Sequence, residues 1–441
     1  MLSRRSAALH IALALGGVAP GIVVSLAHLE VSPFLGMAIF GLAIWFAATL
    51  LGWAAETAEM DITGAFAMAL LAIVAILPEY AVDVLLAFKA GTDPAYEALA
   101  SANMNGATRL LIGFALPLVV LTGIHTRRRH ARQLAADSNR PTTAKPAKPA
   151  KPASATSSGS SGSSASSSRP ANAFFDVLPI PKAHYSVMFF LVIAAGLGML
   201  APFTGQIQAG LGAVLIVVFV VFLWHSSRGD VHEPDLVGVS AFLGSLAKVP
   251  RRLWVIGFFL IAAATIAVGA EPFVHSLVES GRTLEINEAL LIQWVAPLAS
   301  EAPEFIIALT LAYRHKAWAA VGMLLTSMVN QWAALVGSLP FAYKLGGGAW
   351  SLPLDGRQIE EFLLTGSVTA VAVTLLLRLR IPAWGAWFML AVFAAEFALP
   401  ESHARLILAA VNAVAAICLL IAGRRQLPAL IKQPFGLNPT A

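Results

Sequence analysis

The chain has 441 residues, of which 58% are hydrophobic and 12% are charged, and its mean hydropathy is +0.76. Because a soluble globular protein carries about a quarter charged residues, this composition excludes a soluble protein. The net charge of +5 comes from Lys and Arg beside apolar segments rather than on one soluble module, so we expect no nucleic-acid partner.

Apolar runs of about twenty residues recur along the chain, and each is long enough to cross a hydrocarbon core of about 30 Å. They predict an all-α polytopic membrane protein with about twelve transmembrane helices, whereas a β-barrel would show short alternating segments. The first run follows a basic start and could be read as a signal peptide, but its length favours an uncleaved helix. In chain order, the predicted helices cover residues 7–28, 35–55, 62–89, 101–125, 184–202, 206–226, 252–275, 286–313, 317–343, 360–378, 383–399 and 403–423.

A segment of low complexity separates two groups of helices. It contains Ala-Lys-Pro repeats followed by a Ser/Gly tract, neither of which can bury an apolar face, so we expect a disordered linker. The predicted organisation is an extra N-terminal helix (1–34), a first half (35–125), the linker (126–183), connecting helices with a loop (184–251), a second half (252–400), and an extra C-terminal helix with a tail (401–441).

Lys and Arg in the short connections predict the orientation of the helices. If every apolar run crosses the membrane, the basic clusters fall on one side, which is then the cytoplasm. We therefore expect an inner (plasma) membrane protein whose N-terminus, C-terminus and linker are cytoplasmic. One acidic connection, around Glu56 and Asp61, runs against this trend. The basic clusters are Arg4 with Arg5, Arg127–Arg129, Lys248 with Arg251 and Arg252, Arg314 with Lys316, Arg378 with Arg380, and Arg424 with Arg425.

Two Pro-Glu dipeptides stand inside apolar runs, and they end at Glu79 and at Glu304. Glu79 precedes Gly113 by 34 residues, and Glu304 precedes Gly337 by 33. In the predicted topology, the helix with Glu79 runs outward and the helix with Glu304 runs inward. Two similar segments of opposite orientation are typical of an inverted-repeat transporter, whose site lies between the repeats near the midplane. Each proline also breaks its helix and leaves backbone carbonyls that could bind a cation.

This pattern resembles the two α-repeats of the cation/Ca2+ antiporter superfamily, the sodium/calcium exchanger-like membrane proteins. That family has Gly-Thr-Ser-Leu-Pro-Glu in one helix and Gly-Ser-Asn-x-x-Asn (or Asp) in the next, twice, in inverted orientation. The resemblance covers about residues 62–113 and 286–337. It is carried by Leu77-Pro78-Glu79, by Ser300 with Pro303-Glu304, and by Ser327 with Gln331. The departures are Val74-Ala75-Ile76 in place of Gly-Thr-Ser, Ala107 or Thr108 where Asn is expected, and the additional carboxylates Asp83 and Glu301.

The resemblance implies a cation site in which Glu79 and Glu304 are paired acidic ligands. An unpaired carboxylate in hydrocarbon costs at least a few kcal/mol, so intramembrane acids normally pair, bind an ion or face a cavity. The residues expected to supply neutral oxygens are Asn103, Ser300, Ser327 and Gln331, with Asn105 and Asn330 as further amides. Such neutral side chains are also common as contacts between helices, which is the competing interpretation.

Three further charged residues lie close to these positions in the sequence. Asp83 follows Glu79 by four residues and Glu301 precedes Glu304 by three, so each shares the helical face of its neighbour. We expect both to tune the charge of the site or to carry protons. Arg109 is expected to pair with Asp83, because a buried Arg requires a counter-charge. Arg109 could also replace one positive charge in the site.

The predicted function is secondary active cation antiport, with Ca2+ exchanged for Na+ or H+ by alternating access. We expect no enzymatic activity and no cofactor beside the transported cations, and the expected partners are the lipid bilayer and small inorganic cations. A passive channel or a transporter of another solute on the same scaffold is the alternative. A second alternative is a membrane-embedded hydrolase that uses the acids as general acid and base. The chain, however, has no HExxH motif and no nucleophile elbow.

Overall fold

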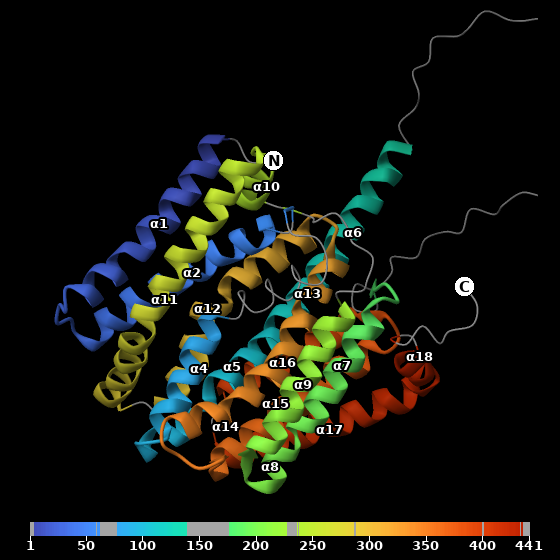
Figure 1. Cartoon of the computed structure of the whole chain (residues 1–441). Coiled ribbons are helices and arrows are strands. Elements are labelled where there is room, and N and C mark those ends of the chain that lie inside the picture. Colours follow the sequence, from blue (N-terminus) through green and yellow to red (C-terminus); the bar gives the residue numbers. More distant parts are fainter. Residues whose placement is uncertain are drawn as a thin grey trace, which may run out of the picture.

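The computed structural model describes residues 4–58, 60–61, 77–138, 176–226, 236, 238–285, 288–398, 401–432 and 434. These residues are almost entirely helical, which confirms the predicted fold class (Figure 1). Most of the predicted linker (139–175) and the first part of the predicted helix 62–89 (62–76, with Val74-Ala75-Ile76) lie outside the described residues. The strands within the described residues form two short antiparallel ribbons. These are β1 (Val177–Pro179) with β4 (Arg380–Pro382), and β2 (Gln206–Gln208) with β3 (Ser351–Pro353).

The chain before β1 contains the described part of the first repeat. Pro94 is the first residue of the 3-10 helix η1, a position where a backbone N–H would have no acceptor within the helix, so the missing N–H of proline costs nothing. Asp93 caps that helix, because its side chain accepts a hydrogen bond from the Ala95 N–H. The segment η2 is π-helical, a wide turn between two α-helices. The elements are α1 (Arg4–Leu26), α2 (Pro33–Ala58), α4 (Leu77–Ala90), η1 (Pro94–Leu99), α5 (Ala102–Arg109), η2 (Leu110–Ala115) and α6 (Leu116–Ser138).

The chain after β1 contains the connecting helices and the second repeat. The segment η4 is also π-helical, so both repeats carry a wide turn in their second helix. Asp355 and Gln358 form a capping box, in which each side chain accepts from the other's backbone N–H at 2.7 and 2.8 Å and so starts α15. The elements are α7 (His184–Gly198), α8 (Leu200–Thr204), α9 (Ala209–Ser226), α10 (Gly238–Gly244), α11 (Lys248–Leu284), α12 (Glu288–Tyr313), α13 (Ala317–Asn330), η4 (Gln331–Leu335), α14 (Val336–Leu345), α15 (Gly356–Leu376), α16 (Ala383–Ala398), α17 (Ser402–Gly423), η5 (Arg424–Gln426) and α18 (Leu427–Lys432).

The number of membrane-spanning helices agrees roughly with the prediction. Within the described residues, nine helical segments are long and apolar enough to cross a membrane. A tenth is α12, which bends by 55° between Leu290–Ala302 and Glu304–Tyr313. Pro303 lies at this bend, and a proline inside a helix is a usual cause of a kink. The shorter apolar helix α16, together with α4, which is described only from Leu77, accounts for the remaining predicted runs.

Three helices form a layer beside a larger bundle. α1, α2 and α11 lie together at one side of the molecule (Figure 1), with Leu50 and Phe258 in their shared core. A second apolar cluster, which includes Phe40, Leu86 and Phe273, joins this layer to α4, α5 and α12. The largest cluster holds the remaining helices of the bundle. The helices that carry the two Pro-Glu dipeptides therefore lie between the layer and the bundle.

Small residues allow the closest approaches between helices. A Cβ added to Gly106 would lie 1.6 Å from the Gln293 carbonyl oxygen, so α5 and α12 approach each other closely at this point. A Cβ on Gly337 would lie 2.8 Å from the Gly212 carbonyl oxygen, which places α14 close to α9 in the same way. Membrane helices depend on such close packing, because lipid provides no hydrophobic drive for helices to associate.

Polar groups organise the ends of the helices. Arg127 donates a hydrogen bond to the backbone of β1, and the rings of His130 and His315 lie 5.4 Å apart, so basic clusters that are distant in the sequence meet at one end. Arg251 binds Asp61 through two hydrogen bonds of 2.7 Å. The acid that runs against the charge trend is therefore paired with one of the basic clusters.

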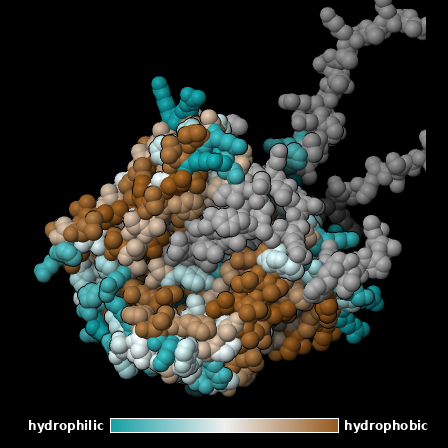
Figure 2. All heavy atoms as spheres, viewed as in Figure 1, coloured by the Kyte–Doolittle hydropathy of each residue, from teal (hydrophilic) through white to brown (hydrophobic). Residues whose placement is uncertain are grey.

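The surface of the molecule fits a lipid environment. Figure 2 shows hydrophobic residues over much of the visible face, with hydrophilic residues gathered mainly toward its rim. Large apolar side chains such as Val217, Leu260 and Ile407 are well exposed on long helices. Lipid tails would cover these side chains, whereas each helix satisfies its own backbone groups.

Candidate functional site

Four carboxylates from the two repeats lie inside the protein. α4 carries Glu79 and Asp83, which are 4% and 0% exposed, and α12 carries Glu301, which is 4% exposed, and the half-buried Glu304. Glu79 interacts electrostatically with both Asp83 and Glu304, and Glu301 interacts electrostatically with both Glu304 and Glu79. The structure therefore brings together the acids that the sequence placed in separate halves of the chain.

The second repeat supplies its acids with neutral hydrogen-bond donors. The Ser327 hydroxyl on α13 donates to Glu304 Oε2 at 2.7 Å, and Gln331 Nε2 at the start of η4 donates to Glu301 Oε1 at 3.0 Å. Ser300 behaves differently, because its hydroxyl donates within its own helix to the carbonyls of Ala296 and Pro297. Ser327 and Gln331 thus contact the carboxylates, whereas the Ser300 hydroxyl is bonded to its own helix.

The first repeat places polar atoms in the interior without hydrogen-bond partners. Asn103 on α5 is 1% exposed and lies close to Asp83. Both side-chain polar atoms of Asn103, both carboxylate oxygens of Asp83 and Glu79 Oε1 are buried and have no hydrogen bond of normal geometry within the described protein. Since buried polar atoms are nearly always satisfied, these oxygens are the part of the molecule best suited to receive a cation, a proton or water.

Tyr80 links the two repeats beside the acids, a contact that sequence reasoning missed. Its hydroxyl donates to Asn330 Oδ1 at 3.4 Å, and it also lies near Glu79 and Asp83. Asn330, named from the sequence as a further amide, is therefore used by this contact. An aromatic residue directly after the Pro-Glu dipeptide was the only signal in the sequence.

The acids do not form a closed metal cage in this arrangement. Among the described residues, no group of three or more His, Cys, Asp or Glu side chains converges closely enough to hold a metal ion. A bound Ca2+ takes six to eight oxygen ligands, so amide, hydroxyl and carbonyl oxygens would have to join the carboxylates. Pro303 at the bend of α12 has no N–H, so the helical hydrogen bond that it would donate to the preceding turn is missing beside Glu304.

The predicted pairing of Arg109 with Asp83 is wrong. Arg109 is 2% exposed, and its guanidinium forms a close ion pair with Glu361 of α15 and a second one, at 3.4 Å, with Glu396 of α16. It also stacks on the ring of Trp294, with 5.1 Å between the guanidinium carbon and the ring centroid. The charge of Arg109 is therefore balanced by two carboxylates outside the repeats and not by Asp83.

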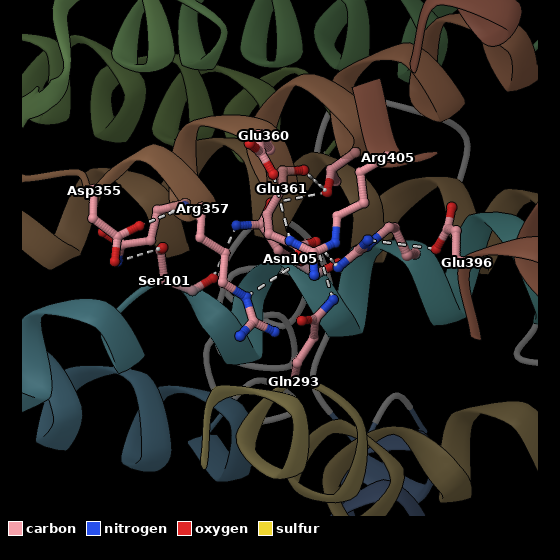
Figure 3. A network of polar contacts seen from close by, with 12 residues as sticks. Ser101, Asn105, Gln293, Asp355, Arg357, Glu360, Glu361, Glu396 and Arg405 are labelled. Carbon is pink, nitrogen blue, oxygen red and sulfur yellow. Dashed lines mark hydrogen bonds and ion pairs between the residues drawn. The ribbon is translucent and has the colours of Figure 1, made fainter. Parts of the chain in front are cut away.

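Figure 3 shows a network of polar contacts that includes Glu361, Glu396, Arg405, Gln293 and Asn105. We call it the Arg109 network, because Arg109 forms ion pairs with both Glu361 and Glu396. Glu361 accepts a hydrogen bond from Gln293 of α12 at 3.1 Å and is paired with Arg405 of α17 at 3.5 Å. Asn105 accepts from the Thr365 hydroxyl at 2.9 Å, which ties a second residue of α5 to α15. The network therefore connects α5, which carries Asn103, and α12, which carries Glu301, to α15, α16 and α17.

Sequence reasoning missed most of the Arg109 network. Glu361 and Glu396 lie 252 and 287 residues after Arg109, so no local spacing connects them. A signal was nevertheless present, because both glutamates fall inside runs predicted to be transmembrane, and an intramembrane Arg calls for intramembrane acids. Asn105, considered as a site amide, belongs to this network, and within the described residues its hydrogen bonds go to other groups than the four carboxylates.

Comparison with known proteins gives a consistent result. Residues 32–142 and 254–398 match the family model described as sodium/calcium exchanger protein. The crystal structure of the H+/Ca2+ exchanger CAX shares 30% identity with the chain, covers 98% of both chains and superposes with a TM-score of 0.83. The structure of native YfkE, at 14% identity, covers 92% of this chain and 99% of its own with a TM-score of 0.56, which concerns the fold alone. No curated protein matches the chain.

Proposed function

The chain belongs to the sodium/calcium exchanger protein family, and we propose that it is a secondary active antiporter that exchanges Ca2+ for protons across a membrane. The observation that carries this proposal is the meeting of Glu79, Glu301 and Glu304 from two helices of opposite predicted direction. A transported cation needs such a shared site, because each half of an inverted-repeat transporter then contributes to one binding place.

The proposed cation ligands are the residues whose oxygens face the cluster. Glu79 and Glu304 supply opposite carboxylates, Asn103 supplies an unpartnered amide, and Ser327 lies against Glu304. Gln331 holds Glu301 by its Nε2 while its Oε1 stays buried and unpartnered, so that oxygen is available as a ligand. Ser300 is the weakest of the ligands expected from sequence, since its hydroxyl is occupied by its own helix.

The exchange follows from electrostatics in a low-dielectric site. Ionised carboxylates this close together repel one another, and a divalent cation removes that repulsion. When Ca2+ leaves, protons take its place on the same oxygens. Because the two cargoes compete for the same carboxylates, one enters only as the other departs. Alternating access then follows if the helices around the site open first to one side and then to the other.

Protons are favoured over Na+ as the coupling ion by three observations. Within the described residues, only one serine hydroxyl, that of Ser327, is hydrogen-bonded to any of the four acids. The solved structure with 30% identity is an H+/Ca2+ exchanger. The additional acids Asp83 and Glu301 also suit proton exchange, because each provides a further carboxylate beside the paired ligands.

The test is uptake of radioactive Ca2+ into sealed proteoliposomes. One set carries an outward proton gradient, a second carries an outward Na+ gradient, and a third carries none. We expect uptake with the proton gradient, loss of that uptake in Glu304→Gln, and normal uptake in the matched control Glu279→Gln, which changes a partly exposed acid at the end of α11.

The other outcomes would each correct a different part of the proposal. Uptake driven only by the Na+ gradient would mean that Na+ is the coupling ion in place of protons, and that the protein is still a Ca2+ antiporter. Equilibration of Ca2+ without any gradient, retained in Glu304→Gln, would indicate a passive channel. Absence of Ca2+ movement in folded protein would mean that another cation is the substrate.

A further inference from the structure

Three arginines line one cavity at the end of α15 and α17. Arg378 follows α15, and Arg424 with Arg425 forms the turn η5 after α17. The cavity has a volume of about 450 Å3, and no carboxylate is among its lining residues. We call it the arginine pocket; its lining residues are Arg378, Ile421, Ala422, Arg424, Arg425 and Gln426.

The three guanidinium groups of the arginine pocket form no ion pair with a carboxylate of the described residues. Within the described residues, no acid pairs with Arg378, Arg424 or Arg425, in contrast to Arg251 and Arg405, which bind carboxylates. Arg378 donates to the carbonyl of Ala422, which holds its side chain at the end of α17. Three cations kept together without a counter-charge repel one another, so an anion that lies between them is favoured.

The pocket also contains a polar oxygen without a partner. Gln426 Oε1 is buried and has no hydrogen bond within the described residues. Gln426 is the last residue of η5, directly after Arg425. A ligand with a hydroxyl group could donate a hydrogen bond to this oxygen while its anionic group binds the arginines. A guanidinium group can donate two parallel hydrogen bonds to one phosphate.

An apolar stripe on α17 leads to the arginine pocket. Its side chains are exposed and follow one another at intervals of three or four residues, so they share one face of the helix. The last of them, Ile421, is itself part of the pocket lining. The stripe consists of Ile407, Val411, Val414, Ile417 and Ile421.

We propose that the arginine pocket binds the phosphate headgroup of an anionic phospholipid, with an acyl chain of the same lipid along the stripe of α17. The pocket supplies three cations at the end of a lipid-exposed helix, and the stripe supplies apolar surface that continues from it. A soluble phosphate would use only the first of these features. Basic pockets beside membrane helices on the cytoplasmic side are suited to such headgroups.

The position of the pocket agrees with the predicted topology. Arg378 lies two residues before β4, which begins at Arg380 and whose partner strand β1 is bound by Arg127. The arginine pocket therefore lies at the end where the basic clusters meet, and this end is the predicted cytoplasmic side. The inner leaflet carries the negative surface potential that attracts basic segments.

The test measures lipid binding to delipidated, purified protein in a neutral detergent by native mass spectrometry. The probes are phosphatidylglycerol, phosphatidylcholine and inorganic phosphate. The pocket variant is Arg424→Gln/Arg425→Gln, and the matched control is Arg129→Gln/Arg132→Gln, which removes two exposed cations from α6. Thermal unfolding without lipid is measured for both, and we expect it to be unchanged because all four side chains are exposed.

We expect phosphatidylglycerol to bind the wild type and the control variant equally, and phosphatidylcholine to bind much less. Each arginine removed should weaken phosphatidylglycerol binding about fivefold, hence about 25-fold for the pocket variant. Equal binding of the two lipids, or an unaffected pocket variant, would overturn the proposal. Displacement of the lipid by millimolar phosphate would overturn it in favour of a soluble anion. The assay needs no ion gradient, so its result is independent of the exchange proposal.

Discussion

The hydroxyl of Ser327 donates a hydrogen bond to Glu304 Oε2 over 2.7 Å, and so it joins the two helices of the second repeat beside the bend of α12. Ser300 stands only four residues before Glu304 on the same helix, yet its hydroxyl is bonded to the backbone of that helix. Two serines that look equivalent in the sequence therefore have different relations to the site.

The first prediction compares these two serines. Ser327→Ala removes a hydroxyl that holds Glu304 and that is placed to serve as a cation ligand, whereas Ser300→Ala removes a hydroxyl bonded within its helix. A hydrogen bond to a charged group contributes about 1.5–3 kcal/mol, so we expect the half-saturating Ca2+ concentration to rise about tenfold or more in Ser327→Ala. It should change little in Ser300→Ala. Concentration series of Ca2+ uptake measure both, and a larger effect in Ser300→Ala would contradict the assignment.

The second prediction concerns Arg109. Arg109→Leu leaves Glu361 and Glu396 buried without their common partner, and breaking such a pair costs about 3–5 kcal/mol. We expect a large fall in the thermal unfolding temperature in detergent. The matched control is Arg282→Leu, whose ion pairs with Glu279 and Glu288 are exposed, and which should unfold nearly as the wild type does.

The same variant series tests where the charge of Arg109 acts. Arg109→Gln/Glu361→Gln removes both members of the ion pair and keeps polar side chains of similar size, so the protein should stay folded enough for transport measurements. If the charge of Arg109 acts outside the cation site, the number of coupling ions per Ca2+ is unchanged in this double variant. A changed ratio, measured from reversal potentials in proteoliposomes, would place the charge of Arg109 at the site.

The third prediction uses the contact between α5 and α12. A Cβ at Gly106 would lie 1.6 Å from the Gln293 carbonyl oxygen, so Gly106→Ala must push apart the helices that carry Asn103 and Glu301. We expect reduced stability, by about 1–3 kcal/mol, and a loss of Ca2+ uptake. Gly210→Ala on α9 is the control, because no atom lies within 4 Å of its added Cβ. Equal behaviour of the two variants would show that the close approach is not needed.

The fourth prediction is a pH dependence outside the membrane. Hydrogen bonding to Arg251 holds the pKa of Asp61 below its ordinary value of 3.8, although burial acts in the opposite direction. The unfolded chain therefore binds this proton more readily than the folded protein does, and the pair stabilises the fold at neutral pH. That contribution is lost as the pH falls below about 4.

The measurement for Asp61 is thermal unfolding across pH. At pH 7, Asp61→Asn should unfold at a lower temperature than the wild type, and the difference should shrink as the solution is acidified below about pH 4. Glu97→Gln is a suitable comparison, since Glu97 accepts a hydrogen bond from Tyr343 and has no Arg partner among the described residues. A difference at Asp61 that does not depend on pH would contradict the pairing.

The sequence was sufficient for the fold class and for the proximity of the two Pro-Glu segments. Apolar runs of membrane length leave few architectures, and acids inside such runs have to meet something polar. Glu79 and Glu304 could be paired from the matched spacing of the two Pro-Glu segments together with the family resemblance that these segments carry. The cation-binding roles of these residues, and of Asn103, Ser327 and Gln331, stay predictions until transport is measured.

The sequence was not sufficient to choose between partners within reach. Arg109 and Asp83 are neighbours in the first repeat, and nothing in the sequence weighs that pairing against distant glutamates such as Glu361 and Glu396. The outcome depends on how α15 and α16 pack against α5, which is a tertiary property. The direction of the Ser300 hydroxyl is equally invisible, because a serine inside a helix can bond to the preceding turn or to a neighbouring chain segment.

Both repeats carry a π-helical segment in their second helix, η2 with six residues and η4 with five. The two segments do not stand at matched positions, because η2 begins 31 residues after Glu79 and η4 begins 27 residues after Glu304. A π-helical turn is wider than an α-helical one, so it changes the register of the side chains that follow it. An alignment of the two halves by residue spacing alone therefore brings unlike positions together, and it should be anchored on the Pro-Glu dipeptides and on the three-dimensional structure.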